Sequence, residues 1–161
     1  MASRIPADPY ALGLAWLARR ELTEQQLRQR LRTRQVVPAH IDQAMTRLRH
    51  VGALDNRRTA FAYARTAVRL TTRGPRRVLQ ELAARGIDGD LAREAVDAAF
   101  AEVDDAARLA RALDKRLDGP IRDAAQRRRL HRALERQGFP SSSIVRALDA
   151  APSLDGDDSG S

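Results

Sequence analysis

Hydrophobic residues recur along this chain with the spacing of amphipathic α-helices, and one arrangement of them occurs three times. In each copy, two apolar residues lie four positions apart and precede a polar turn and one large apolar residue. The copies are Leu27, Leu31 and Val36; Val78, Leu82 and Ile87; and Leu130, Leu134 and Phe139. Successive copies begin 51 and 52 residues apart. A repeat of this length predicts a tandem helical array in which each unit buries its apolar face against its neighbours.

Each unit is expected to hold three helices, so the predicted fold is all-α with three tandem three-helix repeats. The predicted helices span residues 9–20, 23–34, 38–51, 57–70, 75–85, 91–101, 104–117, 120–136 and 141–148. Capping signals set several of these boundaries. Thr23 and Gln26 form a capping box, Pro75 suits a first turn, and Gly86 and Gly138 end middle helices.

These elements predict an N-terminal extension (1–9), three repeats (10–55, 56–101 and 102–150) and a disordered acidic tail (151–161). One of the serines at 141–143 is expected to cap the last helix. The tail consists mainly of Gly, Ser, Asp, Pro and Ala, which offer almost nothing to bury.

Positive charge is spread along the whole helical body. The net charge is +8, and all but one of the 29 basic residues are arginine. Because the last eleven residues hold three acids and no base, the rest of the chain carries +11. Such a field favours an acidic protein surface or a nucleic acid as partner. The alternative is a solvated, arginine-rich surface with no partner.

The chain lacks the residue patterns of an enzyme or a metal protein. Cysteine is absent, and none of the common nucleotide-binding, hydrolase or zinc motifs occurs. His40, His50 and His131 fall in separate elements. We therefore expect no enzymatic activity, no cofactor and no metal. No apolar run reaches about 18 residues, and the first ten residues lack a signal-peptide pattern, so we expect a cytoplasmic protein without a membrane segment.

Two groups of arginines have a geometry that suggests binding. On the predicted helix 120–136, four arginines fall within roughly 80° of one another at about 100° per residue. They are Arg122, Arg129, Arg132 and Arg136. This stripe either binds carboxylates or phosphates, or is a solvated face.

The second group, Arg73, Arg76 and Arg77, surrounds the start of the helix predicted at 75–85. A helix N-terminus disfavours cations by roughly 0.3–1 kcal/mol each, and Glu81 can offset only Arg77 at the i+4 spacing. Free amides and guanidinium groups together suit an anion, so this helix start is a predicted anion site.

Four segments, taken in order, resemble the RecX family of regulatory proteins. They are Leu17–Leu31, Gly52–Asp55 followed by Phe61, Gly74–Ile87, and Arg136–Phe139. The resemblance covers about residues 10–150. Gln35 stands where the family usually has glycine, and Asn56 stands where a second acidic residue is common.

The resemblance implies an elongated, curved solenoid that binds the RecA filament on DNA. Members lie in the filament groove and restrain RecA's ATPase, strand exchange and co-protease activity. Candidate contacts in and beside the matched segments are Arg28, Arg32, Arg73, Arg76, Arg77 and Arg85, together with the arginines of the 120–136 stripe. Single- or double-stranded DNA is a further candidate partner, and we expect a monomer. Two alternatives stay open: a helical-repeat protein that binds DNA without RecA, and a purely structural adaptor.

Overall fold

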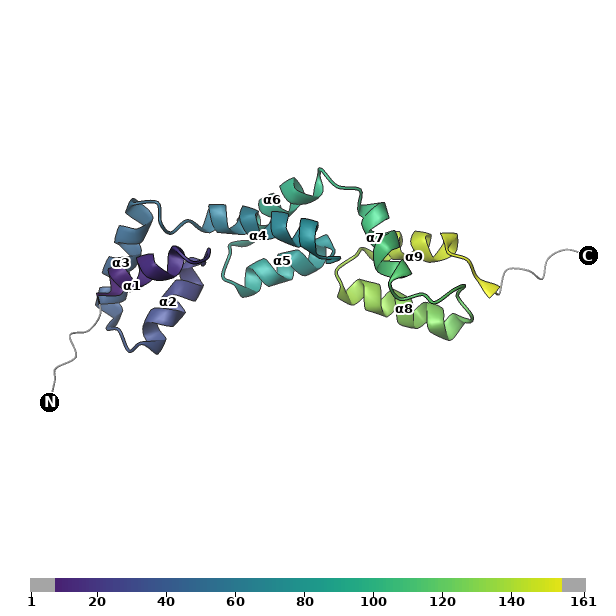
Figure 1. The fold of residues 1–161 in the computed structure, drawn as a ribbon, viewed down its shortest axis with the longest axis horizontal. Helices are drawn as coiled ribbons and strands as arrows, with labels where there is room; N and C mark the ends of the chain where they lie inside the picture. Colours follow the sequence, from purple (N-terminus) through teal and green to yellow (C-terminus); the bar gives the residue numbers. More distant parts are fainter. Residues whose placement is uncertain (1–7, 155–161) are drawn as a thin grey trace, which may run out of the picture.

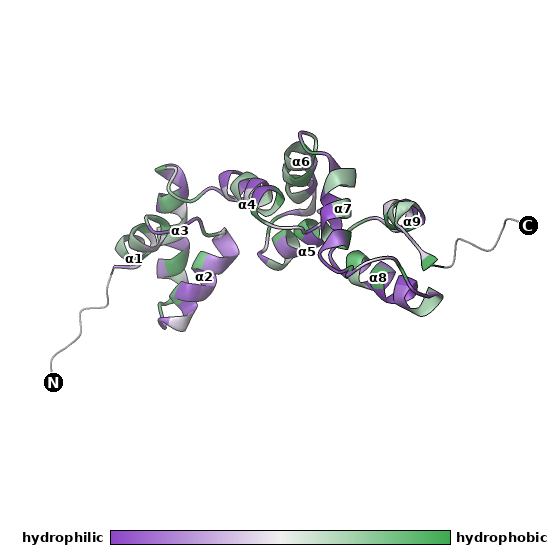
Figure 2. Ribbon diagram, turned by 45° about the vertical axis from the view of Figure 1, so that its right-hand side comes forward, coloured by the Kyte–Doolittle hydropathy of each residue, from purple (hydrophilic) through white to green (hydrophobic). Residues whose placement is uncertain are grey.

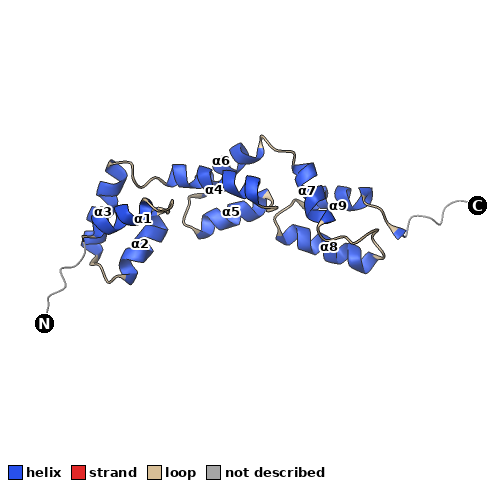
Figure 3. Cartoon of the chain, viewed as in Figure 1, coloured by secondary structure: helices blue, strands red, loops and turns tan. Residues whose placement is uncertain are grey.

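The computed structural model describes residues 8–154, and the elements of that part are α-helices joined by loops (Figure 3). The first repeat consists of α1 (Pro9–Leu17), α2 (Glu24–Thr33) and α3 (Pro38–His50). The second consists of α4 (Asn56–Leu70), α5 (Pro75–Ala84) and α6 (Gly89–Phe100). The third consists of α7 (Asp105–Asp114), α8 (Ala124–Arg136) and α9 (Ser141–Ala150). The all-α prediction is confirmed, with helix ends displaced by up to four residues.

The repeats follow one another along the long axis of an elongated molecule (Figure 1). The middle helices α2, α5 and α8 lie along one edge, the lower one in this view. That edge is shallowly concave, because α5 lies above the line that joins α2 to α8.

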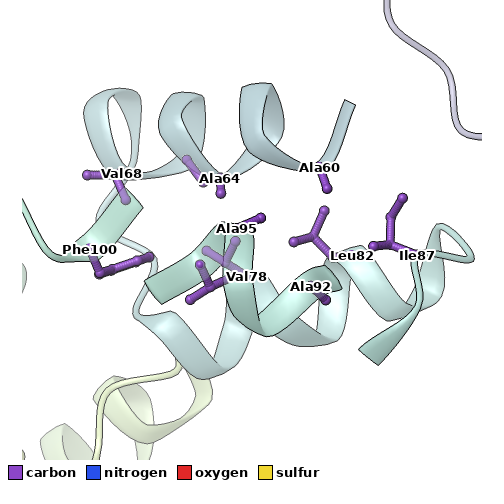
Figure 4. Packing of buried hydrophobic residues seen from close by; sticks show 11 residues of the cluster. Ala60, Ala64, Val68, Val78, Leu82, Ile87, Ala92, Ala95 and Phe100 are labelled. Atoms are coloured by element: carbon purple, nitrogen blue, oxygen red, sulfur yellow. The ribbon is translucent and has the colours of Figure 1, made fainter. Parts of the chain in front are cut away.

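Each repeat has its own small core. In the second repeat, alanines of α4 and α6 let these helices approach closely over Val78 and Leu82 of α5 (Figure 4). In the first repeat, Gly13 of α1 allows a similar approach, since a Cβ atom there would lie 2.6 Å from Leu48 Cδ1. Small side chains therefore produce thin helix-on-helix layers.

The repeats are joined end to end through their middle helices. Thr23, the N-cap of α2, donates its hydroxyl to the carbonyl oxygen of Arg85, the C-cap of α5, at 2.6 Å. Gly74, the N-cap of α5, donates its amide to the carbonyl oxygen of Gln137, the C-cap of α8, at 2.7 Å. At both junctions the positive end of one helix dipole meets the negative end of the next.

Buried polar side chains gather at these junctions. Within residues 8–154, the buried polar or charged residues are Thr23, Thr59 and Arg108. Thr59 lies within hydrogen-bonding distance of Glu21 and Leu22 of the first repeat, and Arg108 donates to carbonyls of the second. The hydrogen bonds compensate for the burial of the two threonines and for part of the burial of Arg108, and they fix how adjacent repeats meet.

Three local expectations were wrong. The helix predicted from residue 120 begins at Ala124, because the carboxylate of Asp123 caps it by accepting from the amide of Gln126. Ile121, which lies within the predicted helix, instead precedes α8; it is buried and forms an isolated backbone bridge with Ser153. The predicted disordered tail is therefore ordered as far as Leu154, and 155–161 lie outside the described residues.

The third error concerns the start of α9. Its N-cap is Pro140, and no side chain caps it, so none of the serines at 141–143 has the predicted role. The hydroxyl of Ser141 instead lies 3.0 Å from Nε2 of His131 on α8.

Candidate functional site

The candidate arginines fall along the row formed by α2, α5 and α8, which we call the middle-helix row. These three helices carry ten arginines and three acidic residues, whereas the other six carry ten arginines and seven acidic residues. Figure 2 shows most of α2 coloured as hydrophilic. The positive charge of the molecule is thus concentrated on one edge of the array, the edge along which the repeats are joined.

At the first helix of this row, Arg28 and Arg32 differ in their partners. Arg28 forms a salt bridge with Asp42 of α3. Arg32 is exposed and forms no ion pair among the described residues. Arg32 is therefore the freer of the two for an external carboxylate or phosphate.

The start of α5 is not the free anion site that its sequence predicted. The amide of Arg76 donates to the carbonyl oxygen of Gly138 at 3.2 Å. A Cβ atom on Gly138 would lie 2.2 Å from the amide nitrogen of Arg77, so the turn after α8 covers this helix end. The carbonyl dipoles of α8 already compensate the positive end of α5.

Glu81 pairs with two of the three clustered arginines, whereas its i+4 spacing predicted a pair with Arg77 alone. Its carboxylate binds Arg77 at 3.0 Å and Arg73 at 3.3 Å. Of the three clustered arginines, only Arg76 is exposed and without an ion pair in the described part of the chain.

A hydrogen-bonded network on the second repeat links α4 to α5. The hydroxyl of Tyr63 donates to Glu81 at 2.6 Å, and burial raises the pKa of this hydroxyl. Burial by itself would raise the pKa of Glu81. Hydrogen bonds from Tyr63 and Arg77 and the charge of Arg73 outweigh it, and that pKa is lowered. The guanidinium of Arg85 lies over the Tyr63 ring, 4.3 Å from its centroid. The network runs along α5, from Arg73 and Arg77 at its start beside the third repeat to Arg85 at its end beside the first.

On α8, three of the four predicted stripe arginines share one face. Arg129, Arg132 and Arg136 are exposed and have no ion pair among residues 8–154. Arg122 is also exposed, but it precedes α8 and its amide donates to the side chain of Gln126. The stripe is therefore shorter than predicted, because the helix begins after Arg122.

Three arginines of the first repeat that rest on aromatic rings were not singled out by sequence patterns. Arg30 and Arg34 lie over Trp16, at 5.7 and 5.9 Å from the ring centroid, and Arg47 lies over Tyr10 at 3.9 Å. These contacts hold arginines of the first repeat against its aromatic residues. An i+4 spacing of Arg30 and Arg34 was visible in the sequence, but their distance to Trp16 depends on how α1 crosses α2.

The chemistry that this surface offers is charge recognition. Exposed guanidinium groups along an elongated edge can bind carboxylates or phosphates, often through two hydrogen bonds at once. Among residues 8–154, no three histidine or acidic side chains are grouped as metal ligands. None of the described helices is long and apolar enough to cross a bilayer.

Comparison with known proteins gives the same family for both of the first two repeats. A family model described as the first three-helix domain of RecX matches residues 10–48, and one described as the second matches residues 55–96. The third repeat lies outside both matched ranges.

Whole-length relatives extend this likeness. The regulatory protein RecX of Chromohalobacter salexigens is 33% identical over 144 residues, covering 88% of this chain and 91% of the relative. That of Halorhodospira halophila is 37% identical over 141 residues, covering 86% and 85%.

Solved structures share the fold. A crystal structure of RecX from Lactobacillus salivarius superposes with a TM-score of 0.73 at 18% identity, covering 89% of this chain and 96% of that one. A second RecX crystal structure gives a TM-score of 0.79 at 22% identity, covering 89% of this chain and 73% of that one. With two matched domains and relatives above 30% identity across most of its length, this chain belongs to the RecX family of regulatory proteins.

Proposed function

We propose that this protein binds the RecA filament on DNA and restrains RecA's ATPase, strand exchange and co-protease activity. Family membership supports a regulatory role in processes that involve RecA. The observation that carries the proposal is the middle-helix row. Its three helices carry ten arginines but only three acidic residues, along one edge of the molecule. An elongated cationic edge fits a groove in which acidic protein surface surrounds a phosphate backbone.

The proposed mechanism is non-enzymatic and operates in the cytoplasm. Exposed arginines without ion pairs form the contacts, above all Arg32, Arg76, Arg129, Arg132 and Arg136. Because hydrogen bonds join the repeats end to end through their middle helices, one monomer can span several contact points on the filament at once. Several individually weak contacts that are linked in one molecule then give a high overall affinity.

The test is RecA's DNA-dependent ATP hydrolysis with increasing amounts of this protein. We expect the rate to fall at substoichiometric amounts, and the protein alone to hydrolyse no ATP. The variant Arg129→Gln/Arg132→Gln should need more protein for the same inhibition. The matched control is Arg65→Gln/Arg146→Gln, which removes two exposed arginines of α4 and α9 outside the row.

An unchanged ATPase rate at saturating protein would contradict the proposal. Equal weakening by both double variants would contradict the assignment to the middle-helix row. Tight binding to DNA in the absence of RecA, with no effect on RecA's activity, would instead identify a DNA-binding helical repeat. Binding activity that no arginine variant changes would favour a purely structural adaptor.

A further inference from the structure

The junction between the second and third repeats contains a hollow with a volume of about 590 Å³. The second repeat lines it with Arg69, Thr71 and Thr72, at the end of α4 and in the following loop. The third repeat lines it mainly with Arg108, Arg111 and Lys115 on and just after α7. Asp114 is the acidic residue among its lining residues. Four cations and one acid therefore converge where two repeats meet.

Arg108 is 5% exposed, whereas the other three cations are exposed. Two of its nitrogens donate to backbone carbonyls, those of Val68 and Arg73, the latter at 2.6 Å. Its Nε atom is buried without a hydrogen bond; it forms a long ion pair with Asp105 at 3.9 Å, and the guanidinium lies 5.2 Å from the centroid of the Phe100 ring. Burial lowers the pKa of Arg108, against the charge of Asp105, which raises it. A buried guanidinium with an unused donor is unfavourable unless a further anion compensates it.

The other junction shows that the repeat fold does not require these cations. The N-caps Asp55 of α4 and Asp104 of α7 define equivalent positions in the two helices. Counted from these caps, Arg108 corresponds to Thr59, Arg111 to Ala62 and Lys115 to Thr66. The first junction thus carries no charge where the second carries three.

Helix dipoles explain only part of the difference. Arg69, Arg111 and Lys115 lie near the C-terminal ends of α4 and α7, where cations are favoured. That effect does not account for the unused Nε of Arg108. Nor does it account for Thr72. Its hydroxyl oxygen accepts a hydrogen bond from the side chain of Gln137 at 3.2 Å, so its O–H group can still donate to another acceptor.

We propose that this hollow, the junction pocket, binds a phosphate monoester group that bridges the second and third repeats. The lining carries a net charge of +3, so a dianionic phosphate balances it better than a single carboxylate does. Thr72 and the two exposed cations Arg111 and Lys115 supply donors from both repeats. No aromatic residue lines the pocket, so recognition is confined to the phosphate group and does not extend to a base.

Calorimetry on the isolated full-length protein tests the proposal. Orthophosphate is the first probe, at constant ionic strength set with sodium chloride. The variant Arg111→Gln/Lys115→Gln should bind orthophosphate roughly tenfold more weakly, the effect of losing about one charge-assisted hydrogen bond. Arg65→Gln/Arg146→Gln removes the same charge from exposed positions outside the pocket and should bind normally.

A short oligonucleotide with and without a 5′-phosphate distinguishes the sources of the group. Tighter binding of the 5′-phosphorylated strand identifies a strand end as the source. Binding of orthophosphate alone identifies the free anion. Equal binding of the two strands is then expected, because neither enters the pocket. Equal weakening in both protein variants, or no binding of orthophosphate and no preference for the phosphorylated strand, would overturn the proposal. RecA is absent throughout, so these outcomes are independent of the proposed inhibition of its ATPase.

Discussion

The amide of Gly74 donates to the carbonyl oxygen of Gln137 across 2.7 Å, and this bond joins the start of α5 to the end of α8. The two residues are far apart in sequence, in different repeats. A hydrogen bond from the hydroxyl of Thr23 to the carbonyl oxygen of Arg85 joins α2 to α5 in the same end-to-end manner. The three middle helices therefore form a head-to-tail column, in which each helix satisfies the exposed groups of its neighbour's end.

The first prediction concerns the glycine that makes this contact possible. Gly138 has φ of +96°, and an added Cβ atom would lie 2.2 Å from the amide nitrogen of Arg77. Gly138→Ala should therefore lower the free energy of unfolding by about 2–4 kcal/mol, from the left-handed backbone and the steric overlap together. Urea denaturation followed by circular dichroism measures the change.

Gly52→Ala is the matched control for this prediction. Gly52 has φ of +69° but nothing within 4 Å of an added Cβ atom. It should cost about 1 kcal/mol, the backbone effect alone. Equal losses for the two variants would mean that the close approach at Gly138 contributes nothing to the junction.

The second prediction concerns Gln35, the residue at which this sequence departs from the glycine usual in the family. Gln35 adopts φ of 58°, the left-handed conformation that glycine adopts at Gly86 and Gly138. Gln35→Gly should raise the free energy of unfolding by about 0.5–1 kcal/mol, since the strain exceeds the extra chain entropy of glycine. The same change at Gln29, exposed in the middle of α2, should lower it by about 1 kcal/mol. Thermal melts that shift in the same direction for both variants would contradict this assignment.

A third prediction follows from the lowered pKa of Glu81. A carboxylate with a lower pKa in the folded state than in the unfolded state stabilises the fold when it is ionised. That contribution is complete above about pH 4.3 and disappears as the pH falls through the folded-state pKa. Glu81→Gln should therefore lose less stability than the unchanged protein between about pH 6 and pH 3.

Glu102→Gln serves as the control for the pH dependence. Glu102 is exposed and forms no ion pair among the described residues. Its variant should follow the unchanged protein at every pH. If Glu81→Gln does so too, the bonds from Arg73, Arg77 and Tyr63 do not contribute to acid stability.

The helices and repeats could be predicted from the sequence because their signals are local. The capping box of Thr23 and Gln26, the proline at the start of α5 and the spacing of Leu27 and Leu31 all formed as expected. Local signals also misplaced the start of α8, where the Asp123 cap and the contact of Ile121 with Ser153 prevailed over Pro120.

The environment of the candidate arginines depended on long-range contacts that no local pattern contains. The amides at the start of α5 were expected to be free, but the turn at Gly138, sixty-odd residues later, covers them. In the sequence, Arg108 lies beside the apolar positions of α7, and nothing in the local pattern indicates that it is buried. Its partners belong to the preceding repeat, and only the packing of the repeats brings them together.

The fourth prediction concerns the end of the chain. Ile121 donates its amide to Pro152 at 2.8 Å and accepts from Leu154 at 2.9 Å. Truncation after Ala150 should therefore cost about 1–3 kcal/mol of unfolding free energy, because two backbone hydrogen bonds and the cover of Ile121 are lost. Truncation after Leu154 keeps these bonds and removes three acidic residues, so it should leave the melting temperature unchanged and strengthen binding to a polyanion. Equal melting temperatures for the two truncations would show that the bridge adds no stability.

The last prediction separates binding from stability at the start of α5. The variant Arg73→Gln/Arg76→Gln removes one arginine that pairs with Glu81 and one that is free. The unfavourable position of cations at a helix N-terminus by itself predicts that this variant is as stable as the unchanged protein or more so. The salt bridge of Arg73 and the coverage of the helix end by Gly138 instead predict that the free energy of unfolding falls by up to about 1 kcal/mol.

Binding of the same variant to the RecA–DNA filament should weaken by roughly 1–3 kcal/mol, the effect of one or two charge-assisted contacts. The control Arg19→Gln/Arg20→Gln changes two exposed arginines just after α1, away from the middle-helix row, and should affect binding less. Melts and filament-binding isotherms at matched salt measure both quantities. If the Arg73/Arg76 variant loses stability but binds normally, these arginines serve the fold alone, and the contact surface lies on α2 and α8.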